Sequence, residues 1–258
     1  MPLQRSHAAG APFEAPAPRA AACRAAVSPF SGDVSVLIVA RMQASATLWG
    51  WSRLVRGSRA LWRERGLRFA RVLGSGHEGR FGLRPSATVQ GLFAVFEDAE
   101  AADTFVERSA EVASWRAHAS ELVVATLRAC SSRGSWGGHT IGVGTALTPR
   151  GRVASLTRAS IRIGRVVPFW RRAPPAQASL DAAAGCVWAV GLGEAPLLRQ
   201  ATFSIWESNA AMDAYARSGA HLEAIRAARQ GEHFAESMFV RFELLSLEGQ
   251  WKGHRLDD

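Results

Sequence analysis

The sequence has 258 residues, of which 48% are hydrophobic and 21% are charged, a composition typical of globular proteins. No apolar run reaches the roughly 18 residues that cross a bilayer, so we expect a soluble or peripheral protein. The formal net charge is +9, but Lys252 is the only lysine. Because arginine beside abundant alanine reflects the codon bias of a GC-rich genome, we do not expect a nucleic-acid partner.

The chain begins with a segment that differs in composition from the rest. Residues 1–32 are rich in Ala, Pro and Arg and lack the continuous apolar stretch of a signal peptide, which predicts a disordered leader. The three cysteines, Cys23, Cys130 and Cys186, show no paired spacing that would indicate a disulfide framework or a zinc site. A reducing, cytoplasmic location is therefore predicted.

An internal repeat organises the remainder of the chain. The string GSWGGH begins at Gly134 and GQWKGH begins at Gly249, and GLFAVFEDAEAADTF, from Gly91, matches ATFSIWESNAAMDAY, from Ala201. Several matches in the same order favour duplication over chance. We expect two repeats, residues 33–139 and 152–254, joined by a linker at residues 140–151.

Each repeat is expected to contain strands and helices in one order. In the first, the patterns predict strands at 34–42, 67–73, 88–96 and 121–128, with helices at 44–65 and after Asp98. In the second they predict strands at 153–162, 186–191, 199–207 and 237–247, with helices at 166–183 and 209–230. The order βαββαβ is that of the ferredoxin-like unit, whose sheet has one open face. Two units can cover each other, so an α+β fold is predicted: an intramolecular dimeric α/β-barrel.

A glycine-rich string in the first repeat resembles a dinucleotide-binding turn but lacks its context. GSGHEG, Gly74–Gly79, satisfies G-x-G-x-x-G, yet Pro85 and a strand follow where a phosphate-binding helix would begin. We interpret it as a bend between strands. Hydrolase, zinc-protease and P-loop motifs are absent from the sequence.

The segment from Leu48 to Arg65 alternates large apolar residues with arginines at near-helical spacing. Such a pattern is typical of a helix that lies in a membrane interface. It is equally typical of an amphipathic helix that packs on a sheet with its arginines in solvent. Both interpretations stay open at this point.

One histidine differs from the other six. His221 lies inside the predicted helix of the second repeat, and the matching position of the first repeat is Glu111. A helical histidine is more often a packing or surface residue than a ligand, but its presence in one repeat alone fits a single asymmetric site.

Several strings in the second repeat resemble the spheroidene monooxygenase family. They are Thr157–Arg158–Ala159, Phe169–Trp170, GLGEAP from Gly191, QATFSIW from Gln200, His221 with Ala224–Ile225–Arg226, and Gly249, Trp251 and Gly253. The resemblance implies oxygenation of an acyclic carotenoid beside its terminal methoxy group to give a keto-carotenoid. It also implies dioxygen, reduced ferredoxin and a b-type haem as reaction partners.

The same resemblance implies roles for individual residues. His221 would be the proximal ligand of the haem iron, and Arg158 or Arg226 would pair with a haem propionate, which suits the planar donors of arginine. Four aromatic residues would line the substrate pocket: Phe169, Trp170, Phe203 and Trp206. Plain core packing is the alternative for these aromatics, and a non-catalytic barrel that binds haem or an apolar ligand is the alternative function. A lipid-soluble substrate favours peripheral contact of the 48–65 segment with a membrane.

Overall fold

The computed structural model describes residues 32–80, 82, 84–144, 149, 151–195, 197–217, 219, 222, 223, 226 and 233–256. The predicted leader, apart from Gly32, lies outside these residues. Among the described residues, no helix is long and apolar enough to cross a membrane. Cys130 and Cys186 are both free thiols.

Both halves of the described chain show the predicted element order. The first half contains β1 (Val34–Met42), α1 (Thr47–Arg56), β2 (Leu67–Gly76), β3 (Pro85–Phe96), α2 (Ala99–Arg108), α3 (Ala110–His118) and β4 (Ala119–Gly134). The second contains β5 (Val153–Ile161), α4 (Val166–Asp181), β6 (Cys186–Ala195), β7 (Arg199–Trp206), α5 (Asn209–Ala216) and β8 (Phe234–Trp251), followed by the short β9 (His254–Arg255).

The first predicted helix, residues 44–65, is interrupted. A short 3-10 turn precedes α1, which ends where Gly57 adopts a positive φ of 60°, and a second 3-10 turn covers Arg59–Arg63. A left-handed residue after the last turn stops a helix, and glycine adopts that conformation without steric cost. The expectation of one continuous helix is therefore wrong.

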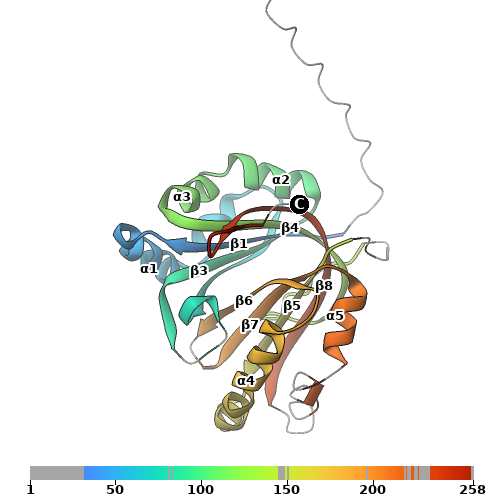
Figure 1. The fold of residues 1–258 in the computed structure, drawn as a ribbon. Helices are drawn as coiled ribbons and strands as arrows, with labels where there is room; N and C mark the ends of the chain where they lie inside the picture. The colour runs from blue at the N-terminus through green and yellow to red at the C-terminus, as the bar shows by residue number, and fades with distance from the viewer. Residues whose placement is uncertain are drawn as a thin grey trace, which may run out of the picture.

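The strands close into an eight-stranded antiparallel barrel, as Figure 1 shows. The order is β4-β1-β3-β2 in the first half and β6-β7-β5-β8 in the second. One seam between the halves is short, with Gly74 opposite Gly193 and Ser75 opposite Leu192. The other seam, β4 with β8, runs from Val123 opposite Gly249 to Gly134 opposite Met238. Helices α1, α2 and α3 surround the upper half in Figure 1, and α4 and α5 the lower half.

Side chains fill the barrel interior, as expected for a barrel of eight strands. The buried cluster there takes residues from all eight strands, including Phe93, Phe203 and Phe242. The repeated turn motifs contribute Trp136 and Trp251 to this cluster, and Trp136 stacks on Phe93 with ring centroids 5.6 Å apart. The repeated motif thus serves to pack the barrel.

Candidate functional site

The two halves present equivalent outer sheet faces to their helices. In the first half Val34 pairs with Phe96 and Ile38 with Leu92. In the second half Val153 pairs with Trp206 and Thr157 with Thr202, in the same register. Position by position, the two outer faces can therefore be compared.

The outer face of the first half is apolar and covered. Its residues are buried in a cluster with α2, α3 and the turn after α1: Val36, Ile38, Val72, Leu92, Ala94, Phe96, Leu61, Phe105, Trp115 and Val124 among them. Burying such side chains against helices is the ordinary way in which a sheet–helix layer is stabilised. The side chains of this face therefore fill the layer between the sheet and the helices.

The equivalent face of the second half carries small and polar side chains instead. Ser155, Thr157, Thr202, Ser204 and Gly191 stand where the first half has Val36, Ile38, Leu92, Ala94 and Val72. Thr157 is exposed, and Phe239, opposite it on β8, is 38% exposed. Among the described residues, the buried hydrophobic cluster of this layer consists of Val153, Leu180, Trp206 and Met212, with partly buried residues such as Tyr215 packed against it. We therefore take this outer face as the candidate ligand site and call it the second-half face.

Hydrogen bonds fix the floor and the rim of the second-half face. On the floor, Ser155 Oγ and Ser204 Oγ lie 2.9 Å apart, and Trp206 Nε1 donates to Ser204 Oγ over 2.9 Å. At the rim, the Arg241 guanidinium donates to Asn209 Oδ1 at 2.6 Å and to Asp213 Oδ1 at 2.7 Å. These contacts attach α5 to β8.

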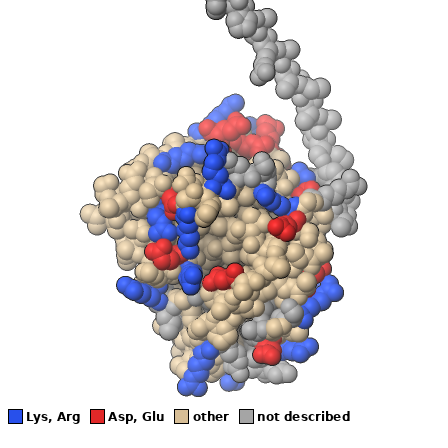
Figure 2. Space-filling model, in the orientation of Figure 1, with Lys and Arg blue, Asp and Glu red and all other residues tan. Residues whose placement is uncertain are grey.

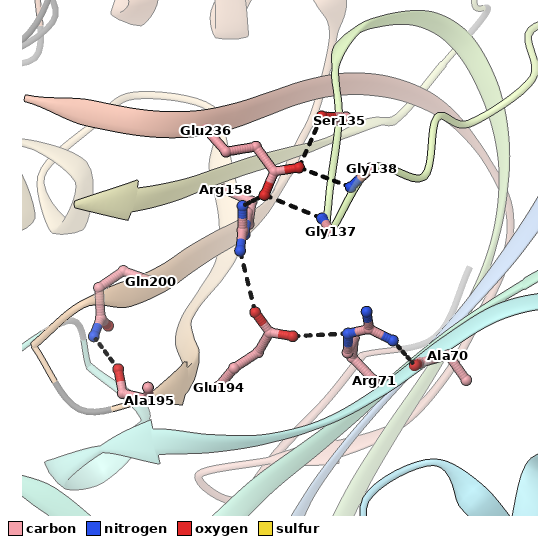
Figure 3. Close-up of polar contacts among 10 residues, drawn as sticks. All are labelled: Ala70, Arg71, Ser135, Gly137, Gly138, Arg158, Glu194, Ala195, Gln200 and Glu236. Carbon is pink, nitrogen blue, oxygen red and sulfur yellow. Dashed lines mark hydrogen bonds and ion pairs between the residues drawn. The ribbon is translucent and has the colours of Figure 1, made fainter. Parts of the chain in front are cut away.

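A separate chain of charged groups lies on the interior side of the second-half strands (Figure 3). Arg71 Nε donates to Glu194 Oε1 over 2.8 Å, and Arg158 Nη2 donates to Glu194 Oε2 over 3.3 Å. Arg158 Nη1 pairs with Glu236, and the Arg158 guanidinium lies 5.7 Å from the centre of the Trp136 ring. Because Arg71 belongs to the first half, this network ties the two halves together.

Glu236 is the most strongly held group of this network. Its carboxylate accepts hydrogen bonds from Ser135 Oγ at 2.8 Å and from the backbone N–H groups of Gly137 and Gly138 at 3.0 Å each. Burial raises the pKa of Glu236, but the hydrogen bonds from Gly138, Ser135 and Gly137 and the Arg158 contact outweigh it and lower the pKa to about 2. Glu236 is thus a structural anion that holds the first repeated turn against β8.

The structure does not gather all the predicted site residues. His221 lies outside the described residues, and Arg226 is exposed. Arg158 is buried on the interior face of β5, where both terminal nitrogens are held by glutamates, so it is not brought to the second-half face.

The four predicted pocket aromatics lie in three places. Phe169 and Trp170 are neighbours on α4, with ring centroids 5.6 Å apart, and Trp170 Nε1 donates to the Leu197 carbonyl over 3.0 Å. Phe203 packs inside the barrel, while Trp206 faces the helices and packs on Tyr215 at 5.1 Å. Strand residues separated by three point to opposite faces, so Phe203 and Trp206 cannot line one pocket.

The sequence analysis did not predict the second-half face, although the alignment of the two repeats contains a signal for it. The repeat aligns Leu92 with Thr202 and Ala94 with Ser204, both at an offset of 110. Replacement of core apolar residues by hydroxyl residues in one copy alone indicates that this copy does not pack in the same way.

Fold and site together define an α+β protein with a filled eight-stranded barrel and a candidate ligand face outside it. Two solved structures share the fold. An aldoxime dehydratase matches with a TM-score of 0.53 and 12% identity, covering 86% of this chain and 83% of that one. An aldoxime dehydratase in complex with butyraldoxime matches with a TM-score of 0.54 and 11% identity, covering 86% and 81%. At these identities the likeness shows the fold alone.

Sequence relatives give the family. The spheroidene monooxygenase of Rubrivivax gelatinosus is 53% identical over 258 residues, 99% of each chain. The spheroidene monooxygenase of Rhodobacter capsulatus is 35% identical over 226 residues, 85% of this chain and 93% of the relative. No protein-family model matches the sequence. The chain belongs to the spheroidene monooxygenase family and, by this close homology, is a monooxygenase.

Proposed function

We propose that this chain oxygenates an acyclic carotenoid such as spheroidene at the carbon beside its terminal methoxy group, giving a keto-carotenoid. The observation that carries the proposal is the 53% identity to a spheroidene monooxygenase over 99% of both chains. Conversion of a methylene to a ketone requires two successive oxygenations, each using dioxygen and two electrons, followed by loss of water. We propose reduced ferredoxin as the electron donor.

The proposed cofactor is haem b, bound on the second-half face. The small side chains of the described residues support this placement, because Gly191, Thr157 and Thr202 stand where the first half carries Val72, Ile38 and Leu92. Phe239, opposite Thr157, adds an apolar ring that is 38% exposed. When bound, the haem supplies the iron at which dioxygen is activated. We propose His221, on the segment that follows α5, as the residue that holds the iron.

The positions of Arg226 and Arg158 favour different roles for these two arginines. Arg226 is exposed, so it is free of the barrel interior and is the proposed partner of a propionate. Arg158 stays with Glu194 and Glu236 on the opposite side of β5, and we assign it to the stability of the barrel. The haem proposal therefore rests on His221 and Arg226.

We propose that the polyene end approaches beside α4. Phe169 packs edge to face with Trp170 at 5.6 Å and with Phe234 at 5.9 Å, which forms an aromatic wall next to the start of β8. Such a wall can orient an apolar chain end and exclude water from it. The barrel interior is filled by side chains, so it does not compete as the substrate site.

We also infer that the chain is a covalent pseudo-dimer of two ferredoxin-like units that arose by duplication. The matching element order, the matching strand register and the repeated GSWGGH and GQWKGH strings support this inference. It explains how one copy could keep its packed layer while the other changed into a ligand face.

The experiment is a comparison of His221→Ala with His233→Ala in purified, haem-supplemented protein. We expect a Soret band in the unmodified chain and in His233→Ala, and its loss or shift in His221→Ala. Turnover is measured with spheroidene, reduced ferredoxin and isotopically labelled dioxygen, and label in the ketone is the expected result. If haem binds and no oxygen enters the carotenoid, the chain is a non-catalytic haem-binding barrel. If neither variant alters the spectrum, histidine ligation by His221 is wrong.

A further inference from the structure

Helix α1 packs Trp49 and Leu54 on the protein but leaves other large apolar residues exposed. Leu48 and Val55 are 85% and 86% exposed, and Trp51 is half exposed, whereas Arg53 is only 7% exposed. A helix that covers a sheet ordinarily turns its apolar stripe inward and its charges outward. Burial of the Arg53 side chain has a desolvation cost, and yet three large apolar side chains remain in solvent.

The orientation of α1 is fixed by specific contacts. Arg53 pairs with Glu111 of α3, whose other oxygen accepts from Trp115 Nε1 at 2.8 Å. Trp49 stacks on His118 with centroids 4.2 Å apart and an interplanar angle of 2°. These contacts anchor one side of α1, so the exposed side cannot turn inward by a simple rotation of the helix. The exposed apolar side is therefore a feature of the folded protein.

The exposed apolar residues are surrounded by positive charge. Trp62, in the 3-10 turn after α1, is 56% exposed, and Arg56, Arg59 and Arg63 are exposed beside it. Residues 43–63 contain no aspartate or glutamate. Figure 2 shows an uncharged projection at the left edge of the molecule, where Figure 1 draws α1. We call Leu48, Trp51, Val55 and Trp62, with these three arginines, the α1 surface.

We propose that the α1 surface docks the protein on a bilayer that contains anionic lipids. Leucine and valine would enter the boundary between headgroups and acyl chains, and tryptophan is enriched at that depth because its ring is apolar and its N–H is polar. The arginines would face lipid phosphates, where each basic residue near an anionic surface strengthens binding about 5-fold. The complementarity of charge favours an anionic bilayer over a neutral one as the occupant.

Vesicle flotation of the full chain tests the proposal without haem or substrate, so failure of the proposed reaction leaves it unaffected. We expect the chain to float with phosphatidylcholine vesicles that contain phosphatidylglycerol, and to float poorly with phosphatidylcholine alone. Leu48→Glu combined with Val55→Glu should reduce binding to the anionic vesicles at least 10-fold. Because both side chains are exposed, the thermal midpoint of the variant should match that of the unmodified chain.

The second half offers a matched control. Ile163, in the 3-10 turn that precedes α4, and Val167, in the first turn of α4, are 83% and 61% exposed and also lie beside arginines. Ile163→Glu with Val167→Glu should leave flotation unchanged, and Arg59→Gln should weaken binding to anionic vesicles alone, by about 5-fold.

Three results would overturn the proposal. One is equal recovery with and without vesicles, and another is equal loss in the α4 control. The third is a dimer in solution that Leu48→Glu with Val55→Glu converts to a monomer while vesicle binding stays undetectable, which would make the surface an interface between copies.

Discussion

The two halves of the barrel have the same strand order and register, but their outer sheet faces differ in packing. Ile38 and Leu92 of the first half are fully buried under helices. Of their equivalents in the second half, Thr157 is exposed and Thr202 is half-buried. Inside the barrel, Val39 of the first half corresponds to the charged Arg158 of the second. The same strand order and register can thus carry a closely packed outer layer in one half and a more polar outer face in the other.

The largest expected effect comes from the buried charge that distinguishes the second half. Arg158→Leu leaves Glu194 and Glu236 without their shared guanidinium, so we expect a loss of about 4 kcal/mol in the free energy of unfolding. Urea denaturation measures it. Arg217→Leu, which removes an exposed pair with Asp213, should cost less than about 1 kcal/mol. A similar cost for both variants would contradict the structural role of Arg158.

The same network gives stability a dependence on acid pH. Because the pKa of Glu236 is lowered in the folded protein to about 2 from 4.5, its contribution is fully present above pH 4.5 and is lost as the pH falls towards 2. Glu236→Gln should therefore show a smaller loss of stability over this window.

Burial and the nearby Glu107 raise the pKa of Asp103, so Asp103→Asn should gain stability relative to the unmodified chain as the pH rises.

Reciprocal exchanges at one aligned position test the comparison directly. Leu92→Thr places a smaller side chain with a hydroxyl in the packed layer, and we expect a loss of about 3 kcal/mol in the free energy of unfolding. Thr202→Leu should change the free energy of unfolding by less than about 1 kcal/mol. It should reduce carotenoid turnover at least 10-fold, because the larger side chain would occupy space on the second-half face. Unchanged turnover in Thr202→Leu would place the ligand elsewhere.

A smaller effect than that of Arg158→Leu or Leu92→Thr is expected at the polar floor of the second-half face. Ser204→Ala removes the acceptor of Trp206 Nε1 and a partner of Ser155, so we expect a loss of about 1.5 kcal/mol. Ser155→Ala keeps the tryptophan hydrogen bond and should cost less. Thermal unfolding of the two variants in parallel separates these outcomes.

The sequence by itself determined the order of the elements. Apolar periodicity and the repeated strings predicted βαββαβ twice, because strands buried on both faces and glycine-bounded turns leave local signals. The end of α1 at Gly57 is also a local signal. The long alternation of apolar residues and arginines led instead to the prediction of a single helix over residues 44–65. The family resemblance came from ordered strings in the second half, and the sequence relatives confirm it.

Only the tertiary structure decided which way individual side chains point. Arg158 lies inside the barrel because Glu194 and Glu236, 36 and 78 residues away in sequence, are there to receive it. Arg53 is buried and Leu48 exposed because Glu111, 58 residues later, accepts the arginine. Ion pairs between residues so distant in sequence form only when the chain has closed the barrel, so no local pattern could reveal which face of β5 or α1 is turned inward.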